Sequence, residues 1–151
     1  MKRLSIYLFT LILGISWSLG DISAAQAQQS KKIILAGYHH QPPVATTGSG
    51  LATVQLHGDT LTVKGKFKDL VGNYSGAYLM VSLRGQGGNQ LYRLKTDLNE
   101  EKTGGTFIAK ENRFILSAAE KALLKKGDLY INVSSFENQK GELRGNIGPL
   151  G

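Results

Sequence analysis

The chain has 151 residues, no cysteine and a formal net charge of +7 at pH 7. The lack of cysteine excludes disulfide bonds, thiolate metal ligands and lipid attachment at a cysteine. Hydrophobic residues make up 41% of the chain and charged residues 19%, a balance typical of globular proteins and not of disordered ones. We therefore expect a fold that is held together by its core alone.

The first residues have the layout of a secretory signal peptide. A basic start, Lys2-Arg3, precedes an apolar run over 4–19, and a small-x-small cleavage site ends at Ala27. The apolar run is shorter than the ~20 residues that span a bilayer, which argues against a retained membrane anchor. We expect cleavage between Ala27 and Gln28, and export to the periplasm or beyond the cell.

The expected mature chain, 28–151, is long enough for one domain with a sizeable core. Removal of the signal peptide 1–27 changes the count from 18 basic and 11 acidic residues to 16 and 10, so the mature chain keeps a net charge of +6. The sequence predicts no membrane span in this part.

Short strands with alternating apolar residues account for most of the mature chain. The first, over 33–38, ends before Pro42 and Pro43, which cannot donate to a strand ladder. Two alternating runs flank Gly58-Asp59, which is typical of a tight hairpin. Further extended segments are predicted over 79–83, 91–94, 107–108, 113–116, 129–134 and 143–147, with polar turns over 85–89 and 99–105.

One helix is predicted, over Ala118–Lys126. Ser117 is its N-cap, Glu120 completes a capping box, and Gly127 follows where helices often end with a positive φ. One short helix among many short strands indicates an all-β sandwich or barrel.

Four motifs in chain order resemble the CHRD family, the domain repeated in the secreted protein chordin and found singly in many bacterial exported proteins. They are Gln41-Pro-Pro-Val-x-Thr-x-x-x-Gly50, Gly58-Asp-x-Leu-x-Val-x-Gly65, the segment 114–124, and the closing strands with Tyr130-x-Asn-Val and Gly141-Glu-Leu-Arg-Gly. The resemblance covers about 33–147. It implies an immunoglobulin-like Greek-key β-sandwich or barrel, comparable with copper/zinc superoxide dismutase.

The same resemblance raises the question of a metal site, because CHRD domains often carry histidines in a middle strand and in the closing strand. Such imidazoles are suited to zinc or copper. Here the middle strand 76–83 has no histidine, and Ser134 stands in the closing position. We interpret the histidines of this chain as exposed polar loop residues, namely His39, His40 and His57. We therefore predict no metal and no cofactor, with a metal-binding, superoxide-dismutase-like module as the alternative.

Catalytic motifs are also missing from the sequence. Gly85-Gln-Gly-Gly88 lacks the spacing of a phosphate loop and leads into a strand. The few acidic residues form no recognisable acid/base pair. We therefore expect no catalytic residues and no enzymatic activity.

A first candidate site consists of Lys64, Lys66 and Lys68, which alternate with apolar residues and therefore share the outward face of one strand. One interpretation is a basic stripe for anionic polysaccharide, lipid head groups or an acidic partner. The other, which we favour from the sequence, is a solvated face that protects a sheet edge. Nucleic acid is not expected, because no aromatic residues interleave with the lysines.

A second candidate site is the closing hairpin with Asn132, Glu142, Arg144 and Gly145. Glu142 and Arg144 lie two residues apart, and we expect them to pair with each other or with Asn132. A network that fixes the register of the hairpin is favoured over a small binding patch.

Taken together, these features predict a non-catalytic binding or structural module of the cell envelope or extracellular space. Its expected partner is an unknown protein or an anionic envelope component. A basic polyanion- or glycan-binding domain is a further alternative.

Overall fold

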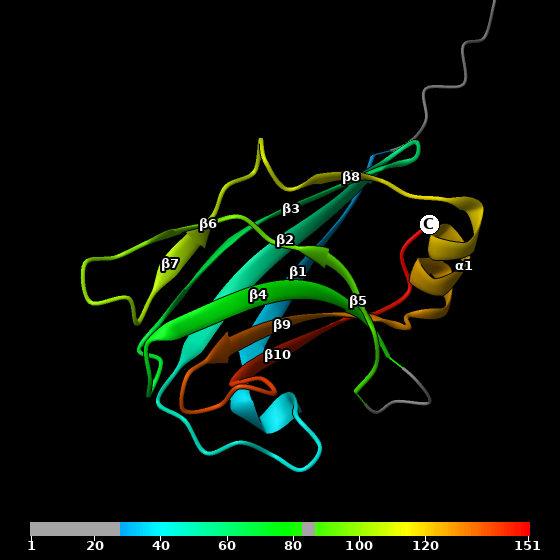
Figure 1. Cartoon of the computed structure of the whole chain (residues 1–151). Coiled ribbons are helices and arrows are strands. Elements are labelled where there is room, and N and C mark those ends of the chain that lie inside the picture. Colours follow the sequence, from blue (N-terminus) through cyan, green and yellow to red (C-terminus); the bar gives the residue numbers. More distant parts are fainter. Residues whose placement is uncertain (1–27, 83–86) are drawn as a thin grey trace, which may run out of the picture.

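The protein is a twisted antiparallel sheet that curls into a half-barrel around one core, with a short helix at one end (Figure 1). This computed structural model describes residues 28–82 and 87–151, so the predicted signal peptide and part of the predicted turn over 85–89 lie outside the described residues. The strands are β1 Gln29–Ala36, β2 Ser49–His57, β3 Thr60–Lys68, β4 Tyr74–Val81, β5 Gln90–Arg93, β6 Thr96–Leu98, β7 Gly105–Phe107, β8 Arg113–Ile115, β9 Leu129–Ser135 and β10 Leu143–Ile147.

The strand order is β5-β4-β9-β10-β1-β2-β3-β7-β6, and β8 pairs with β3 beside β7. Each described pair is antiparallel. Two of the pairings, β1 with β10 and β4 with β9, join strands that are far apart in the sequence. The sheet therefore depends on long-range contacts, and its first and last strands lie side by side.

A short link joins the strands at the two ends of the sheet, and a buried asparagine bonds that link to β3. β5 and β6 lie at opposite ends of the strand order, yet only residues 94 and 95 separate them in the chain. The Asn112 side chain accepts a hydrogen bond from Lys95 N at 2.7 Å and donates one to Lys95 O at 2.8 Å. The Asn112 carbonyl accepts from Val63 N on β3 at 2.9 Å. Asn112 thus ties the link between β5 and β6 to β3, and the sheet curls.

The core lies inside this curl and is built from the inward residues of each strand. Alternation places Val54, Val63, Ile131 and Val133 in it, each fully buried. Tyr130 and Ser134 lie on the other face of β9, but they too are buried.

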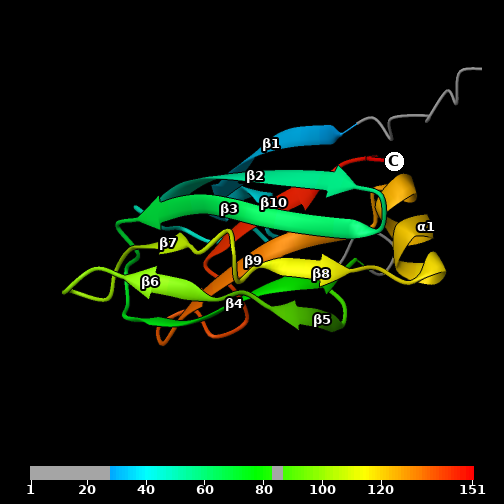
Figure 2. The same ribbon diagram turned by 90° about the horizontal axis from the view of Figure 1, so that it is seen from above.

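The predicted helix is confirmed with its bounds, Ala118–Lys126 (α1), and it covers one end of the half-barrel (Figure 2). The Ser117 and Glu120 side chains form the capping box, and Gly127 ends the helix with φ 81°. Leu124 is fully buried, and its carbonyl accepts a hydrogen bond from Leu150 N, which holds the C-terminus beside α1.

The strand predictions are confirmed in kind but not at every boundary. The Gly58-Asp59 turn joins β2 and β3 with His57 opposite Thr60. β1 begins at Gln29, four residues before the predicted start at 33, because its polar first half still pairs with β2 from Gln29 onwards. Backbone pairing, which carries no hydropathy pattern, therefore extends this strand.

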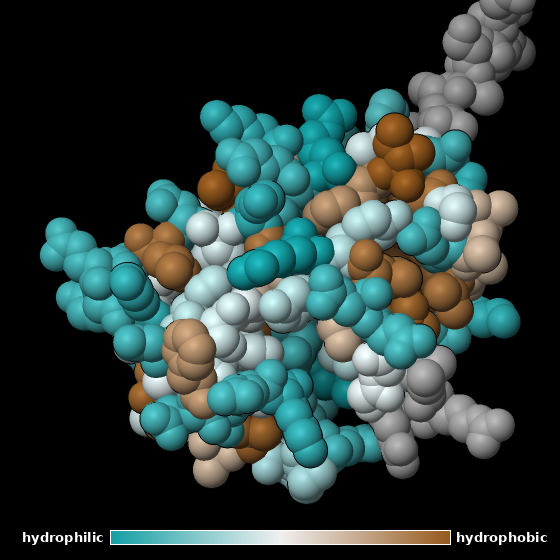
Figure 3. Space-filling view, in the orientation of Figure 1, coloured by the Kyte–Doolittle hydropathy of each residue, from teal (hydrophilic) through white to brown (hydrophobic). Residues whose placement is uncertain are grey.

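The face seen in Figure 3 is mostly hydrophilic, and its hydrophobic groups are separate patches, the larger ones toward α1 and β8. No helix in the described part of the chain is long and apolar enough to cross a membrane.

A core truncation on β9 tests the strand register. We expect Ile131→Ala to lower the free energy of unfolding by about 2–5 kcal/mol, because it removes a fully buried aliphatic side chain from the core. Ser134→Ala, on the opposite face, should cost about 0.5–1.5 kcal/mol, the value of one hydrogen bond. Urea unfolding of both variants measures the difference, and equal midpoints for Ile131→Ala and the parent would contradict the register.

Candidate functional site

The loops that lie opposite α1 meet over a buried carboxylate. Glu142 precedes β10 and is fully buried. Its carboxylate accepts hydrogen bonds from the Thr46 hydroxyl at 2.5 Å and from Val71 N at 2.7 Å, and a longer one from Asn138 Nδ2 at 3.4 Å. These donors belong to three separate loops, over 37–48, 69–73 and 136–142, which we call the loop end.

Glu142 is held ionised by these donors and not by a cation. Burial raises the pKa of the carboxyl, but hydrogen bonds from Ser135, Thr46, the Val71 backbone and Asn138 together lower it further, so the pKa lies below its usual range. Within the described ranges no lysine or arginine forms an ion pair with Glu142. A buried ion of this kind is stable only while its hydrogen bonds are made.

The expected pairing of Glu142 with Arg144 or Asn132 is wrong, whereas Arg144 does lie opposite Asn132 in the register of β9 and β10. Arg144 lies across β9 with its guanidinium 3.8 Å from the centroid of the Tyr130 ring. Its Nε donates to Asn146 Oδ1 at 2.9 Å. Glu142 comes before the strand begins, so its carboxylate turns to the loops, whereas Arg144 projects from the paired strand over Tyr130.

Asn132 and the glycines of the closing motif determine how tightly β10 packs. Asn132 Nδ2 donates to Ser134 Oγ and to Lys140 O, at 3.2 and 3.3 Å. A Cβ on Gly145 would lie 2.5 Å from a methyl carbon of Leu35 on β1, so a side chain there would push β1 away from β10. These contacts fix the hairpin and its neighbour strand.

His39 and His40 are not the exposed loop residues that the sequence predicts. The 3-10 turn η1, Gly37–His39, folds back on β10, so both histidines are half-buried, and His39 Nδ1 lies 2.9 Å from the carbonyl oxygen of Arg144. Burial in this position is caused by the fold of the loop across β10, which no local pattern reveals. His57, at the end of β2, is exposed as expected.

The positions that correspond to the family's histidines do not fit zinc or copper. On β4, Tyr78 projects from the outward face, and its hydroxyl lies over Gly76, the register partner of Ser134. The His40 imidazole and the Asn132 side chain both lie against Gly141. Burial and the positive charge of Arg144 lower the pKa of His40, and the same charge repels a metal cation. No group of three His, Asp or Glu residues able to hold a metal occurs in the described part.

The three lysines of β3 remain exposed, but the edge-protection interpretation is wrong. β3 pairs with β2 along its whole length and with β7 and β8 on its other side, so it is an interior strand with no free edge. Lys64, Lys66 and Lys68 project outward from it, opposite the core. We call the outward surface of β2 and β3 around these residues the lysine face.

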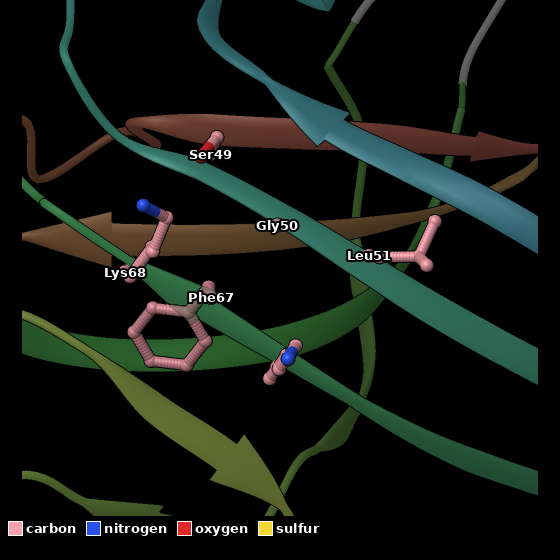
Figure 4. Close-up of a pocket in the computed structure, with 6 residues that line it drawn as sticks. Ser49, Gly50, Leu51, Phe67 and Lys68 are labelled. Atoms are coloured by element: carbon pink, nitrogen blue, oxygen red, sulfur yellow. The ribbon is translucent and has the colours of Figure 1, made fainter.

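Shallow hollows of the surface meet at the lysine face. One of about 290 Å³ lies between β2 and β3 over Gly50, with Leu51 and Lys68 at its two ends (Figure 4). A larger one, of about 690 Å³, extends from Thr53 and Lys64 to Thr106 and Ile108. A third lies toward Asn99. Lys66 lines all three.

The lysine face carries excess positive charge. Lys68 pairs with Asp69 at 2.9 Å, whereas Lys64 and Lys66 form no ion pair within the described ranges. Asp97 on β6 lies at the rim of two of the hollows and is the acidic residue that lines them. An anionic ligand is therefore favoured at the β2–β3 side of the face and disfavoured at its β6 side.

Comparison with known proteins identifies a family. The family model for the CHRD domain matches residues 31–147, which is within two residues of the range predicted from the motifs. No curated protein and no solved structure gives a match.

Replacement of the buried carboxylate tests what holds the loop end. We expect Glu142→Gln to lower the free energy of unfolding at pH 7 by about 1.5–3 kcal/mol, because it removes the charge that its donors stabilise. The folded pKa is depressed, so the contribution of Glu142 is present above the unfolded value of 4.5 and is lost as the pH falls through the folded pKa. The difference in the free energy of unfolding between Glu142→Gln and the parent should therefore become smaller below about pH 4.5.

The control is Glu100→Gln, an exposed turn residue, which should change stability by less than about 0.5 kcal/mol. If the difference in the free energy of unfolding between Glu142→Gln and the parent stays constant from pH 7 to pH 3, the charge of Glu142 contributes nothing to stability.

Proposed function

The chain belongs to the CHRD domain family, and on that basis we propose that it is an exported, non-catalytic module that binds an anionic component of the cell envelope or extracellular space. The binding surface in this proposal is the lysine face. The basic start, apolar run and cleavage motif of residues 1–27 support export.

One observation carries the proposal, namely that the surface hollows meet at Lys66 on an interior strand. Lysines on an edge strand have a protective role that needs no ligand. On β3 that role does not apply, and within the described ranges Lys64 and Lys66 have no acidic side chain paired with them. An anionic partner would supply the missing counter-charge.

The polar residues of the closing motif also support a non-catalytic role, because their charged groups are engaged within the protein. The Glu142 carboxylate is occupied by loop donors, and the Arg144 guanidinium lies against Tyr130 and Asn146. Both groups act on neighbouring parts of the chain. We accordingly assign them to the architecture and not to chemistry on a substrate.

We also place the fold in the immunoglobulin-like Greek-key class that the family resemblance implies. The pairings of β1 with β10 and of β4 with β9, each between strands distant in sequence, support this class.

Binding to isolated envelopes tests the function. Protein purified from cells that express the full chain should sediment with envelopes at 50 mM salt and be released at roughly 500 mM, because salt screens exposed charges. The triple variant Lys64→Gln, Lys66→Gln, Lys68→Gln should remain largely in the supernatant at low salt.

The matched control replaces Lys125, Lys126 and Lys140 with Gln, which removes the same charge from α1 and from the turn between β9 and β10. This variant should sediment like the parent. Equal loss of binding in both triple variants would assign the attraction to net charge, and the lysine face would not be the binding surface.

A further inference from the structure

We propose that the occupant of the lysine face is an extended acidic polysaccharide that lies along β3 across Lys64, Lys66 and Lys68. This inference rests on the proposed function and names the class of its ligand. It follows from the spacing of the charges, from the groups that lie between them, and from the shape of the surface.

The charges are arranged in a line that fits a linear polymer. Alternate residues of a strand are about 6.6–6.8 Å apart, so the backbone positions of the three lysines lie in a row over about 13 Å, although the Lys68 ammonium group is paired with Asp69. Lys32 on β1 extends the positive area sideways, because it shares a cross-strand row with Thr53 and Lys64. A ligand with repeated negative charges meets several of these groups at once, whereas a single small anion meets one.

The groups between the lysines suit a sugar backbone. Ser49 and Thr53 on β2 and Thr106 on β7 present hydroxyl-bearing side chains that line the same hollows. Hydroxyl groups both donate and accept hydrogen bonds, as the hydroxyls and ring oxygens of a polysaccharide require. Phe67 and Phe107 also border the hollows, but both are buried in the core. The face thus has no exposed aromatic ring for stacking nucleic-acid bases, which disfavours a single-stranded nucleic acid.

The shape of the face favours a polymer over a bilayer. The hollows are shallow depressions between rows of outward side chains, a form that suits a strand-like chain lying along them. The exposed aliphatic groups on β1 and β2 are Ile34 and Leu51, at 57% and 44% exposure, which face each other. Ile115 on β8 is also exposed, but it lies opposite Thr60 at the far end of β3 from Lys68. One aliphatic pair beside the lysines provides little area for insertion among lipid chains.

The experiment compares two polymers with the same glucan backbone, one sulfated and one uncharged, with one membrane probe. Binding of the purified protein is measured to dextran sulfate, to uncharged dextran, and to vesicles of phosphatidylcholine with one-third phosphatidylglycerol, from 50 to 300 mM salt. We expect binding to dextran sulfate, no binding to dextran, and at least tenfold weaker binding to the vesicles. In the lysine-face triple variant the magnitude of the slope of log affinity against log salt should fall by roughly 2–3. The reason is that each lysine contact contributes about one released counterion to the slope, and the variant lacks up to three such contacts. The Lys125, Lys126, Lys140 variant should keep the parent slope.

A second variant tests whether the larger hollow takes part in binding, without changing any charge. Thr106 is exposed on β7 opposite Lys66, and Thr106→Phe fills the larger hollow. This variant should bind dextran sulfate roughly tenfold more weakly and bind envelopes no better than the parent. If Thr106→Phe binds dextran sulfate as tightly as the parent, the larger hollow is not part of the binding surface.

The remaining outcomes separate this inference from the proposed function. Binding to the anionic vesicles without binding to dextran sulfate would overturn the polysaccharide and leave an anionic partner in place. If the slope of log affinity against log salt falls equally in both triple variants, the lysine face is not the site of binding. Failure to bind polymer, vesicles and envelopes alike would overturn the proposed function itself.

Discussion

The buried carboxylate of Glu142 is the interaction on which the loop end depends. Its donors come from the loops before β2, after β3 and after β9, so one ionised side chain coordinates segments that are distant in the sequence. A buried carboxylate without these hydrogen bonds would cost several kcal/mol. The same loops then cover the outward side of β9 and β10, through the contacts of His39 with the Arg144 carbonyl and of Gly141 with Asn132.

The outward surface of the sheet consequently has two unlike halves. Over β9 and β10 it is closed, and the polar residues Tyr130, Asn132, Ser134 and Arg144 are nearly fully buried. Over β2 and β3 it is open, with exposed lysines and the hollows around them. The polar groups of the first half are buried, so the second half is where a ligand can reach charged side chains.

Local patterns in the sequence predict much of this fold but little of the closed half. The helix with its capping box, the Gly58-Asp59 hairpin and the inward position of Ile131 follow from short-range chemistry that is visible along the chain. The burial of His39 and His40 depends on how a loop crosses a distant strand, and the interior place of β3 depends on pairing with β7 and β8. Asn112, which ties β3 to the link between β5 and β6, gives no signal in a polar stretch of sequence.

The division between a closed structural half and an open binding half is tested most directly by mapping backbone amide chemical shifts during a titration with dextran sulfate. We expect the amide signals of 49–53, 62–68 and 105–107 to shift and those of 37–48, 69–73 and 136–142 to stay in place. Shifts concentrated at the loop end, with 62–68 unaffected, would contradict this expectation.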